Sequence, residues 1–291
     1  HMPLCVSTAS SMTLEQINEI AEGQAWFQLY ADQSGDFVDE IVGRAAAADY
    51  KLLILTVDVP IPSVRIRDLR NGFAFPLRWG LSQLWDFATH PHWSLATLAH
   101  AIGNGMPRPM NYATSSGNTT FVRNASRERA DWSFLAALRD RWHGKLVVKG
   151  VQCPDDAVRI KSMGADAIYL SNHGGRQLNA APAAIDSLGQ IRRAVGTEMP
   201  LIFDGGVRNG EHVVKALAMG ADFVMIGRSA MYGLGAGGRT GLSDILDMTS
   251  REISAVMGLL GYRNPAGITE NCLVSSHEDL LTHALSEKAA E

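Results

Sequence analysis

Short apolar runs alternate with amphipathic helical segments along most of this sequence, and no other feature constrains the fold as strongly. Runs such as Leu52–Leu55 and Ala167–Leu170 contain no charged residue, which is typical of strands buried on both faces of a parallel sheet. A helix is predicted between each pair of runs; Thr13 and Gln16, for example, have the spacing of a capping box. The alternation predicts an α/β protein whose parallel sheet is covered by helices.

Polar residues stand where most of these apolar runs end. They are Ser7, Gln28 and Tyr30, Thr56 and Asp58, Lys149, Ser171 and His173, Asp204, and Gly227 and Arg228. In a (β/α)8 TIM barrel, the carboxyl ends of all the strands form the face that carries the active site. A doubly wound sheet instead gathers its site at one switch point. Polar residues at successive strand ends therefore favour the barrel.

The number of predicted strands departs from that of a closed barrel. Seven runs are visible, whereas a TIM barrel has eight strands. Because the sequence opens inside a strand near Pro3–Ser7, we expect the first strand to be the one that is lacking. We expect a single barrel domain over residues 1–291, closed by a helix from about Leu242 to Leu260. A long insertion, residues 59–131, follows the strand that ends at Asp58 and is expected to be a lid or a binding element.

The segment after Leu170 combines two groups that suit acid–base chemistry on a small anion. His173 has the side chain whose ordinary pKa lies nearest neutrality, so it can take up a proton at physiological pH. Arg176, three residues later, offers a planar fork that can bind a carboxylate through two hydrogen bonds. The pair predicts a site for a small acid that loses a proton. The alternative is a capped turn with a surface histidine.

Two glycine-containing loops near the end of the sequence suit a phosphate group. The first is Asp204–Arg208 and the second is Gly227–Arg228. Glycines let a ligand approach the backbone and arginines add charge, and loops after the last two strands are the recurrent phosphate site of this barrel. Lys149 is expected to balance negative charge on a reduced ring system. The alternative is that the glycines shape tight turns and the cations are solvated.

Composition argues against several classes of function. A net charge of −4 gives no general reason to expect nucleic-acid binding. The three cysteines, Cys5, Cys153 and Cys272, lack metal-ligand spacing, so we expect no metal and a reducing, cytoplasmic location. No apolar run reaches the length of a membrane span.

Seven sequence blocks, taken together, resemble the FMN-dependent 2-hydroxy-acid dehydrogenases and oxidases, a family that includes (S)-mandelate and L-lactate dehydrogenases. The blocks are Ser7–Ser10, Trp26–Tyr30, Thr56–Asp58, Lys149–Gly150, Ser171–Leu178, Asp204–Arg208 and Gly227–Arg228. The resemblance implies FMN as the cofactor. It also implies oxidation of an (S)-2-hydroxy acid, mandelate- or lactate-like, to the 2-oxo acid. Family members begin with a helical segment and a first strand, so this sequence is expected to be an N-terminally shortened member.

The resemblance also assigns roles to individual residues. His173 would be the base, with Asp58 stabilising its protonated form. Arg176 and Arg65 would bind the substrate carboxylate, and Tyr30 would hydrogen-bond the substrate. The residues implied to hold the flavin ring and ribityl chain are Ser7, Gln28, Thr56, Lys149 and Ser171, and those implied at the phosphate end are Asp204, Gly206, Arg208, Gly227 and Arg228.

The insertion combines basic charge with large apolar residues, as elements that lie in a bilayer interface do. Between Val59 and Ala130 the sequence contains eight arginines but only three acidic residues, and Trp79, Trp85 and Trp93 lie in the same segment. The segment resembles the corresponding region of membrane-associated members of the family. We therefore expect peripheral contact with the inner face of a membrane; a lid or a subunit contact are the alternatives.

Other partners follow from the same resemblance. We expect a quinone or oxygen as the electron acceptor and a homo-oligomer as the assembly. One alternative is a catalytically impaired, truncated barrel that binds flavin or a partner without turnover. An FMN barrel isomerase is another, although such an enzyme has no need of His173 with Arg176.

Overall fold

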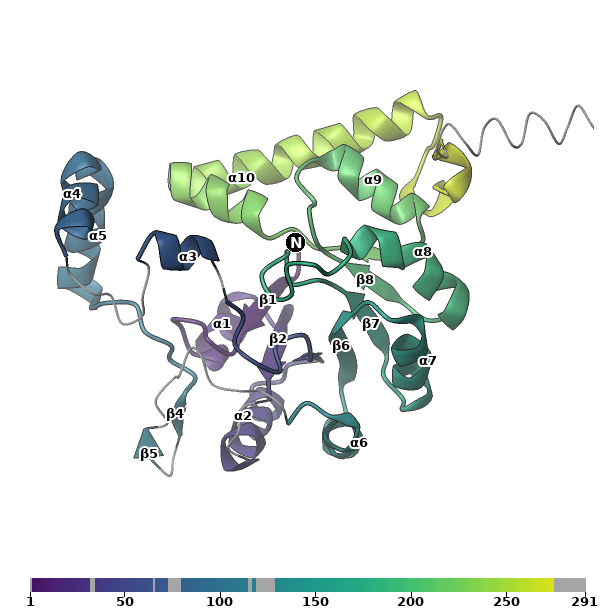
Figure 1. The fold of residues 1–291 in the computed structure, drawn as a ribbon, viewed down its shortest axis with the longest axis horizontal. Helices are drawn as coiled ribbons and strands as arrows, with labels where there is room; N and C mark the ends of the chain where they lie inside the picture. Colours follow the sequence, from purple (N-terminus) through teal and green to yellow (C-terminus); the bar gives the residue numbers. More distant parts are fainter. Residues whose placement is uncertain are drawn as a thin grey trace, which may run out of the picture. The chain divides into compact units, whose positions relative to one another are not determined.

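The computed structural model describes residues 2–31, 35–64, 66–72, 80–114, 117–118 and 129–274 (Figure 1). The chain divides into two compact units. The first comprises residues 1–149, 163–166 and 176–179, and the second comprises residues 150–162, 167–175 and 180–291. The single domain expected over residues 1–291 stays a prediction.

The first unit contains parallel strands in the order β1-β2-β3-β6. These strands are β1 (Leu4–Ser7), β2 (Ala25–Tyr30), β3 (Leu52–Thr56) and β6 (Lys145–Val151), whose last two residues group with the second unit. In the register of the sheet, Leu29 pairs with Leu55, which pairs with Val148. All three side chains are buried, so the strands predicted from apolar runs are confirmed.

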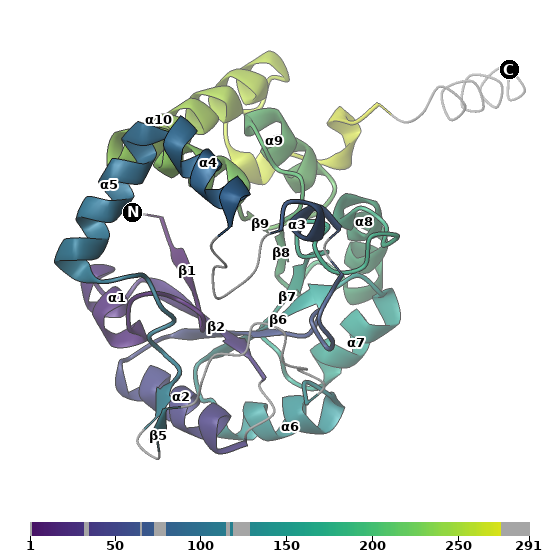
Figure 2. The ribbon, with the colours of Figure 1, turned by 60° about the vertical axis from the view of Figure 1, so that its left-hand side comes forward.

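Three helices cover this sheet on its outer face (Figure 2). They are α1 (Leu14–Ile20), α2 (Gly35–Ala47) and α6 (Trp132–Arg141). The predicted capping box is present at α1, where the Thr13 side chain accepts from the Gln16 N–H and the Gln16 side chain accepts from the Thr13 N–H. Asp131 caps α6 by accepting from the Phe134 N–H.

The insertion folds into short elements of its own. They are α3 (Ile66–Arg70), α4 (Leu81–Thr89), α5 (Pro91–Asn104), and an antiparallel pair formed by β4 (Ala113–Thr114) and β5 (Gly117–Asn118). Helices α4 and α5 lie side by side, with the Phe87 and Trp93 rings 5.4 Å apart. We call this pair of helices the α4–α5 hairpin.

The second unit contains parallel strands in the order β7-β8-β9. The strands are β7 (Ala167–Leu170), β8 (Leu201–Phe203) and β9 (Phe223–Val224), and the helices are α7 (Pro154–Ser162), α8 (Ala184–Val195), α9 (Gly210–Ala218) and α10 (Arg228–Leu259). Two 3-10 turns follow, Pro265–Gly267 and Glu270–Cys272. Helices α9 and α10 pack side by side (Figure 1). Each strand is followed by a helix, as the sequence predicted.

Helix α10 begins much earlier than the sequence predicted. A start near Leu242 was expected, but the helix starts at Arg228, directly after β9, and kinks at Gly237 and Gly238. Across the kink, Gly233 and Gly241 approach so closely that a Cβ on Gly241 would lie 2.2 Å from the Gly233 carbonyl oxygen. Glycines disfavour helix in a sequence-based assignment, whereas here they permit two helical segments to touch.

In each unit, an aspartate paired with an arginine holds the start of a strand in the same way. In the first, Asp166 accepts from the N–H of Leu146 at 2.9 Å and pairs with Arg139 of α6. In the second, Asp222 accepts from the N–H of Leu201 at 2.7 Å and pairs with Arg192 of α8. Both aspartates end a Met-Gly-Ala-Asp sequence, so a short internal repeat marks the same contact in both units.

Candidate functional site

Strands β2 and β3 of the first unit end in two polar side chains that bind each other. Gln28 Nε2 donates to Thr56 Oγ1 at 2.8 Å, and both residues are buried. Thr8, which is also buried, donates its hydroxyl to the Gln28 carbonyl at 2.7 Å. Tyr30 follows Gln28 on the same strand and is half-buried. Buried polar side chains at the ends of parallel strands suit a ligand whose ring carries several hydrogen-bond donors and acceptors.

A cation and a carboxylate lie together at the neighbouring strand ends of the first unit. Lys149 Nζ is 4.0 Å from Asp58 Oδ2, and their side chains are only 12% and 11% exposed. Ser7 ends β1, where its hydroxyl accepts from the Ala9 N–H at 3.2 Å. Asp58 groups with the first unit and His173 with the second, and the expected pairing of these two side chains stays a prediction.

The loop after β7 in the second unit holds His173 in an uncommon backbone conformation. Its φ is 55°, and Gly174 and Gly175 continue the left-handed turn with φ of 64° and 72°. The His173 N–H donates to Ser171 Oγ at 3.0 Å, and the Gly175 N–H donates to the Asn172 carbonyl at 2.9 Å. A left-handed non-glycine residue costs free energy and occurs preferentially at functional sites.

The two glycine-containing loops predicted to bind phosphate are adjacent in the second unit. Ser229, in the first turn of α10, donates its hydroxyl to the Val207 carbonyl at 3.3 Å, which places the start of α10 beside Arg208. Apart from the glycine itself and its chain neighbours, no described atom lies within 4 Å of the place where a Cβ on Gly206 or Gly227 would stand. This leaves open space next to backbone N–H groups.

The two helix N-termini near these loops differ in one respect that matters for an anion. At α9, Asn209 accepts from the His212 N–H at 3.0 Å, and Glu252 of α10 accepts from the Gly210 N–H at 2.7 Å. At α10, no described side chain caps the helix at Gly227. The positive end of α9 is therefore already occupied, and the N-terminus of α10 is the one suited to a phosphate.

Arg228 and Asp204 connect these loops to the rest of the second unit. Arg228 Nη2 donates to the Gly174 carbonyl at 3.0 Å, in the same turn as His173. Asp204 Oδ2 accepts from the Tyr169 hydroxyl at 2.9 Å. Tyr169 was not among the predicted site residues, although it stands two positions before Ser171 on the same face of a strand, which was the available signal.

The structure describes only one of the two arginines predicted to bind the substrate carboxylate. Arg176 is exposed and groups with the first unit. Its carbonyl oxygen accepts from the hydroxyl of Ser63 at 2.7 Å, and Ser63 was not among the predicted site residues. Arg65 lies outside the described residues.

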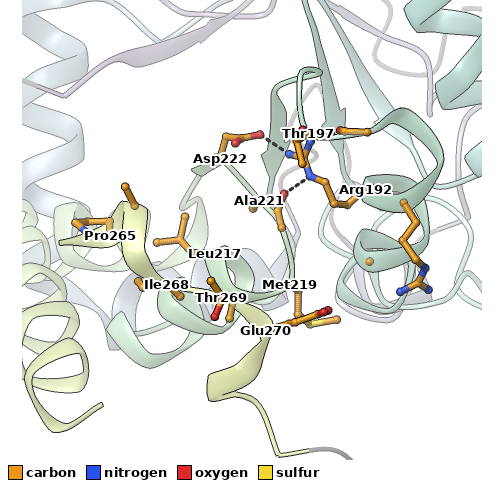
Figure 3. A pocket seen from close by; sticks show the side chains of 16 residues that line it. Arg192, Thr197, Leu217, Met219, Ala221, Asp222, Pro265, Ile268, Thr269 and Glu270 are labelled. Atoms are coloured by element: carbon orange, nitrogen blue, oxygen red, sulfur yellow. Dashed lines mark hydrogen bonds and ion pairs between the residues drawn. The ribbon is translucent and has the colours of Figure 1, made fainter. Parts of the chain in front are cut away.

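A separate pocket of about 840 Å³ lies in the second unit at the C-terminal ends of α8 and α9 (Figure 3). None of the predicted site residues lines it. The Arg192 guanidinium at its wall is already bound to Asp222 and to the Gly196, Met199 and Gly220 carbonyls. The described residues contain no group of three or more His, Cys, Asp or Glu side chains that could hold a metal ion.

Comparison with known proteins places these residues in a family. The sequence profile of the FMN-dependent dehydrogenases matches residues 1–275. The chain belongs to this family. It is 37% identical over 265 residues to (S)-mandelate dehydrogenase of Pseudomonas putida, covering 89% of this chain and 66% of that protein. It is 35% identical to L-lactate dehydrogenase of Caulobacter vibrioides, covering 94% of this chain and 72% of the relative.

Solved structures give the same assignment. The crystal structure of the monotopic membrane protein (S)-mandelate dehydrogenase matches with a TM-score of 0.85 at 35% identity, over 93% of this chain and 72% of that one. A mandelate oxidase variant with (S)-mandelic acid matches with a TM-score of 0.72 at 31% identity, over 92% of this chain and 68% of the other. The fold class is therefore α/β of the TIM-barrel type, as predicted.

FMN is the cofactor expected for a member of the FMN-dependent dehydrogenase family, and two separate sets of residues have the chemistry that parts of FMN need. The buried Gln28 and Thr56 suit the polar edge of a flavin ring. The uncapped start of α10 and the open space at Gly206 and Gly227 suit a phosphate.

Proposed function

We propose that this chain oxidises an (S)-2-hydroxy acid to the 2-oxo acid with FMN as the electron acceptor. The observation that carries the proposal is the strained left-handed turn at His173, flanked by Ser171 and followed by Arg176. A histidine that precedes a carboxylate-binding fork by three residues suits an acid that loses a proton. The names of the relatives point to the same chemistry.

The catalytic roles proposed here are those that the family resemblance implies. His173 removes the proton from the substrate, and Asp58 stabilises the imidazolium that forms, because an opposite charge favours the protonated ring. Arg176 and Arg65 bind the substrate carboxylate, and Tyr30 donates a hydrogen bond to the substrate. FMN, when bound, accepts the two electrons that leave the substrate carbon.

The cofactor-binding residues proposed fall into two groups. The first holds the ring and ribityl chain, where Lys149 adds positive charge; its members are Ser7, Gln28, Thr56, Lys149 and Ser171. The second holds the phosphate end through two guanidinium groups, helix N–H groups and glycine backbone; its members are Asp204, Gly206, Arg208, Gly227 and Arg228.

Anaerobic flavin bleaching tests this function directly. The purified protein, loaded with FMN, is mixed without oxygen with (S)-mandelate, (R)-mandelate or L-lactate, and the visible flavin absorbance is followed. Bleaching by an (S)-acid and none by (R)-mandelate is expected. A yellow protein that none of these acids bleaches would instead favour the impaired, non-catalytic alternative. Reoxidation of the bleached protein by oxygen or by a soluble quinone then distinguishes oxidase from dehydrogenase.

We further propose that the α4–α5 hairpin contacts a membrane surface at the inner face of the membrane, with the protein otherwise cytoplasmic. Its apolar side chains are strongly exposed: Leu81 is 87% and Trp85 is 73% exposed, and Trp93, Leu95 and Leu98 are also exposed. No described helix is long and apolar enough to cross a membrane. A monotopic membrane protein among the matched structures supports this assignment.

The charge on the hairpin changes the expected mode of contact. All eight arginines of the insertion lie outside α4 and α5, whose only Asp, Glu, Lys or Arg residue is Asp86. Attraction by the hairpin itself is therefore apolar, and basic residues elsewhere in the insertion add a salt-sensitive part.

Vesicle flotation tests the membrane contact. Trp85→Gln combined with Trp93→Gln is expected to lower binding to neutral and to anionic vesicles, since both lose apolar insertion. Leu259→Gln, at an 89% exposed position on α10, is the matched control and leaves binding unchanged. Equal flotation of the original protein, the double tryptophan variant and Leu259→Gln would make the hairpin a lid or a subunit contact. Light scattering of the proteins without vesicles tests the expected homo-oligomer.

A further inference from the structure

We propose that Ser63 is a positioning residue for the substrate carboxylate, acting through the backbone of Arg176. This inference rests on the proposed function, in which Arg176 grips the carboxylate of a 2-hydroxy acid. The Ser63 hydroxyl donates to the Arg176 carbonyl at 2.7 Å although the two residues are 113 positions apart in the sequence. Both belong to the first unit.

The segment that carries Ser63 is built to hold that hydroxyl in place. Val59 is 7% exposed and anchors the chain as it leaves β3. Pro60 and Pro62 follow, and each proline ring fixes its own φ and restricts the residue before it. The segment therefore loses little conformational freedom when the hydrogen bond to Arg176 forms.

The contact acts on the direction of the Arg176 side chain. A hydrogen bond to the carbonyl oxygen fixes the peptide plane after Arg176, and with it the ψ angle that sets where the Cα–Cβ bond points. Binding a carboxylate with two parallel N–H···O bonds needs a defined direction of approach. Because Arg176 is exposed, packing contributes little to that direction. Ser63 restrains the backbone from which the Arg176 side chain extends.

Ser63 also stands between two residues with proposed roles in the reaction. Asp58 lies five positions before it and Arg65 two positions after it. The Ser63–Arg176 hydrogen bond thus attaches Arg176 to the segment leaving β3.

Binding of an unreactive substrate analogue tests the inference. The probe is 2-hydroxy-2-phenylpropanoate, which has no hydrogen on its second carbon to lose, titrated calorimetrically into the FMN-loaded protein. Ser63→Ala is expected to raise its Kd roughly three- to tenfold, the range for one lost hydrogen bond. Ser63→Thr keeps the hydroxyl and is expected to bind within about twofold of the original protein.

Two controls separate positioning from a general loss of structure. Ser82→Ala removes an exposed hydroxyl of the same insertion that binds Gln83, and it should leave Kd unchanged. In an Arg176→Lys background, Ser63→Ala should cause no further loss, because its effect passes through the arginine. Additive losses in the double variant, or an unchanged Kd in Ser63→Ala, would overturn the inference.

The same titration distinguishes this inference from the proposed function. If the original protein binds the analogue and Ser63→Ala weakens it, but no 2-hydroxy acid bleaches the flavin, the oxidation fails and the positioning role stands. If bleaching occurs and Ser63→Ala changes neither Kd nor the KM for the acid, the positioning role fails alone. If the original protein does not bind the analogue, the positioning role is wrong.

Discussion

Lys149 Nζ lies 4.0 Å from Asp58 Oδ2, at the ends of neighbouring parallel strands, with both side chains largely enclosed. Two opposite charges that are mostly removed from water depend on each other, because each offsets part of the desolvation cost of its partner. A cofactor bound here would therefore meet the positive and the negative charge together, and not an isolated lysine.

Removing the cation alone is expected to destabilise the protein. Lys149→Met leaves Asp58 without this partner, so the free energy of unfolding in urea should fall by about 1–3 kcal/mol in the FMN-free protein. Lys149→Met combined with Asp58→Asn should recover most of that loss. If the double variant loses as much stability as Lys149→Met and Asp58→Asn lose separately, added together, the two charges are not coupled.

Replacing His173 is expected to separate cofactor binding from chemistry. His173→Asn removes the base while its side chain tolerates the left-handed φ of 55°. FMN content should stay the same, and the rate of anaerobic flavin bleaching should fall by roughly a hundred- to ten-thousand-fold. His92→Gln, at an exposed position on α5, should bleach at the original rate. A His173→Asn protein that bleaches normally would exclude His173 as the base.

The helix crossing at Gly233 is expected to exclude every side chain. A Cβ on Gly233 would lie 2.6 Å from the Gly241 carbonyl oxygen, whereas a Cβ on Gly235 would meet no described atom within 4 Å beyond its chain neighbours and the adjoining helix backbone. Gly233→Ala should lower the melting temperature, at a cost of about 1–3 kcal/mol. Gly235→Ala should raise it slightly, because alanine favours helix by about 0.5–1 kcal/mol over glycine. Equal shifts for the two variants would contradict the close crossing.

Tyr50 is expected to make stability fall at high pH. Burial, helped by the negative charge of Glu15, raises the pKa of Tyr50 to about 12 from the ordinary value of 10.0, and its hydroxyl donates to the Leu14 carbonyl at 2.7 Å. Between these values the unfolded chain has lost the proton that the folded chain keeps, so the free energy of unfolding decreases as pH rises.

Comparison with Tyr50→Phe isolates that contribution. The variant loses the hydrogen bond and is less stable near neutrality, but it should lack the additional decrease between about pH 10 and 12. Urea unfolding at several pH values measures both curves. Parallel curves would mean that Tyr50 does not titrate in this window.

Local patterns in the sequence predicted the strands and most of the helices, because each depends on neighbouring residues. Leu52–Leu55 and Ala167–Leu170 are apolar on both faces and become buried strands, and Thr13 caps α1 as its spacing indicated. The start of α10 was wrong because glycine at Gly233 and Gly241 serves a contact between segments that are distant along the helix. No local pattern reports such a contact.

The candidate site was predicted as a list of residues, and the contacts among them were not. Strand-end positions identified Gln28 and Thr56, yet their hydrogen bond depends on the register of β2 against β3. Tyr169 and Ser63 escaped notice because their partners, Asp204 and Arg176, lie far away in the sequence. Which helix N-terminus suits a phosphate depends on Glu252, a residue with no sequence signature of capping.

The Glu252 contact also sets an order in time. The carboxylate that closes α9 at Gly210 is 42 residues downstream, on the same helix that offers its N-terminus at Arg228. The ribosome must therefore translate past Glu252, and that residue must leave the exit tunnel, before the Gly210 N–H can be capped as it is in the folded protein. A nascent chain that ends before Glu252 therefore lacks the carboxylate that accepts from the Gly210 N–H at the N-terminus of α9.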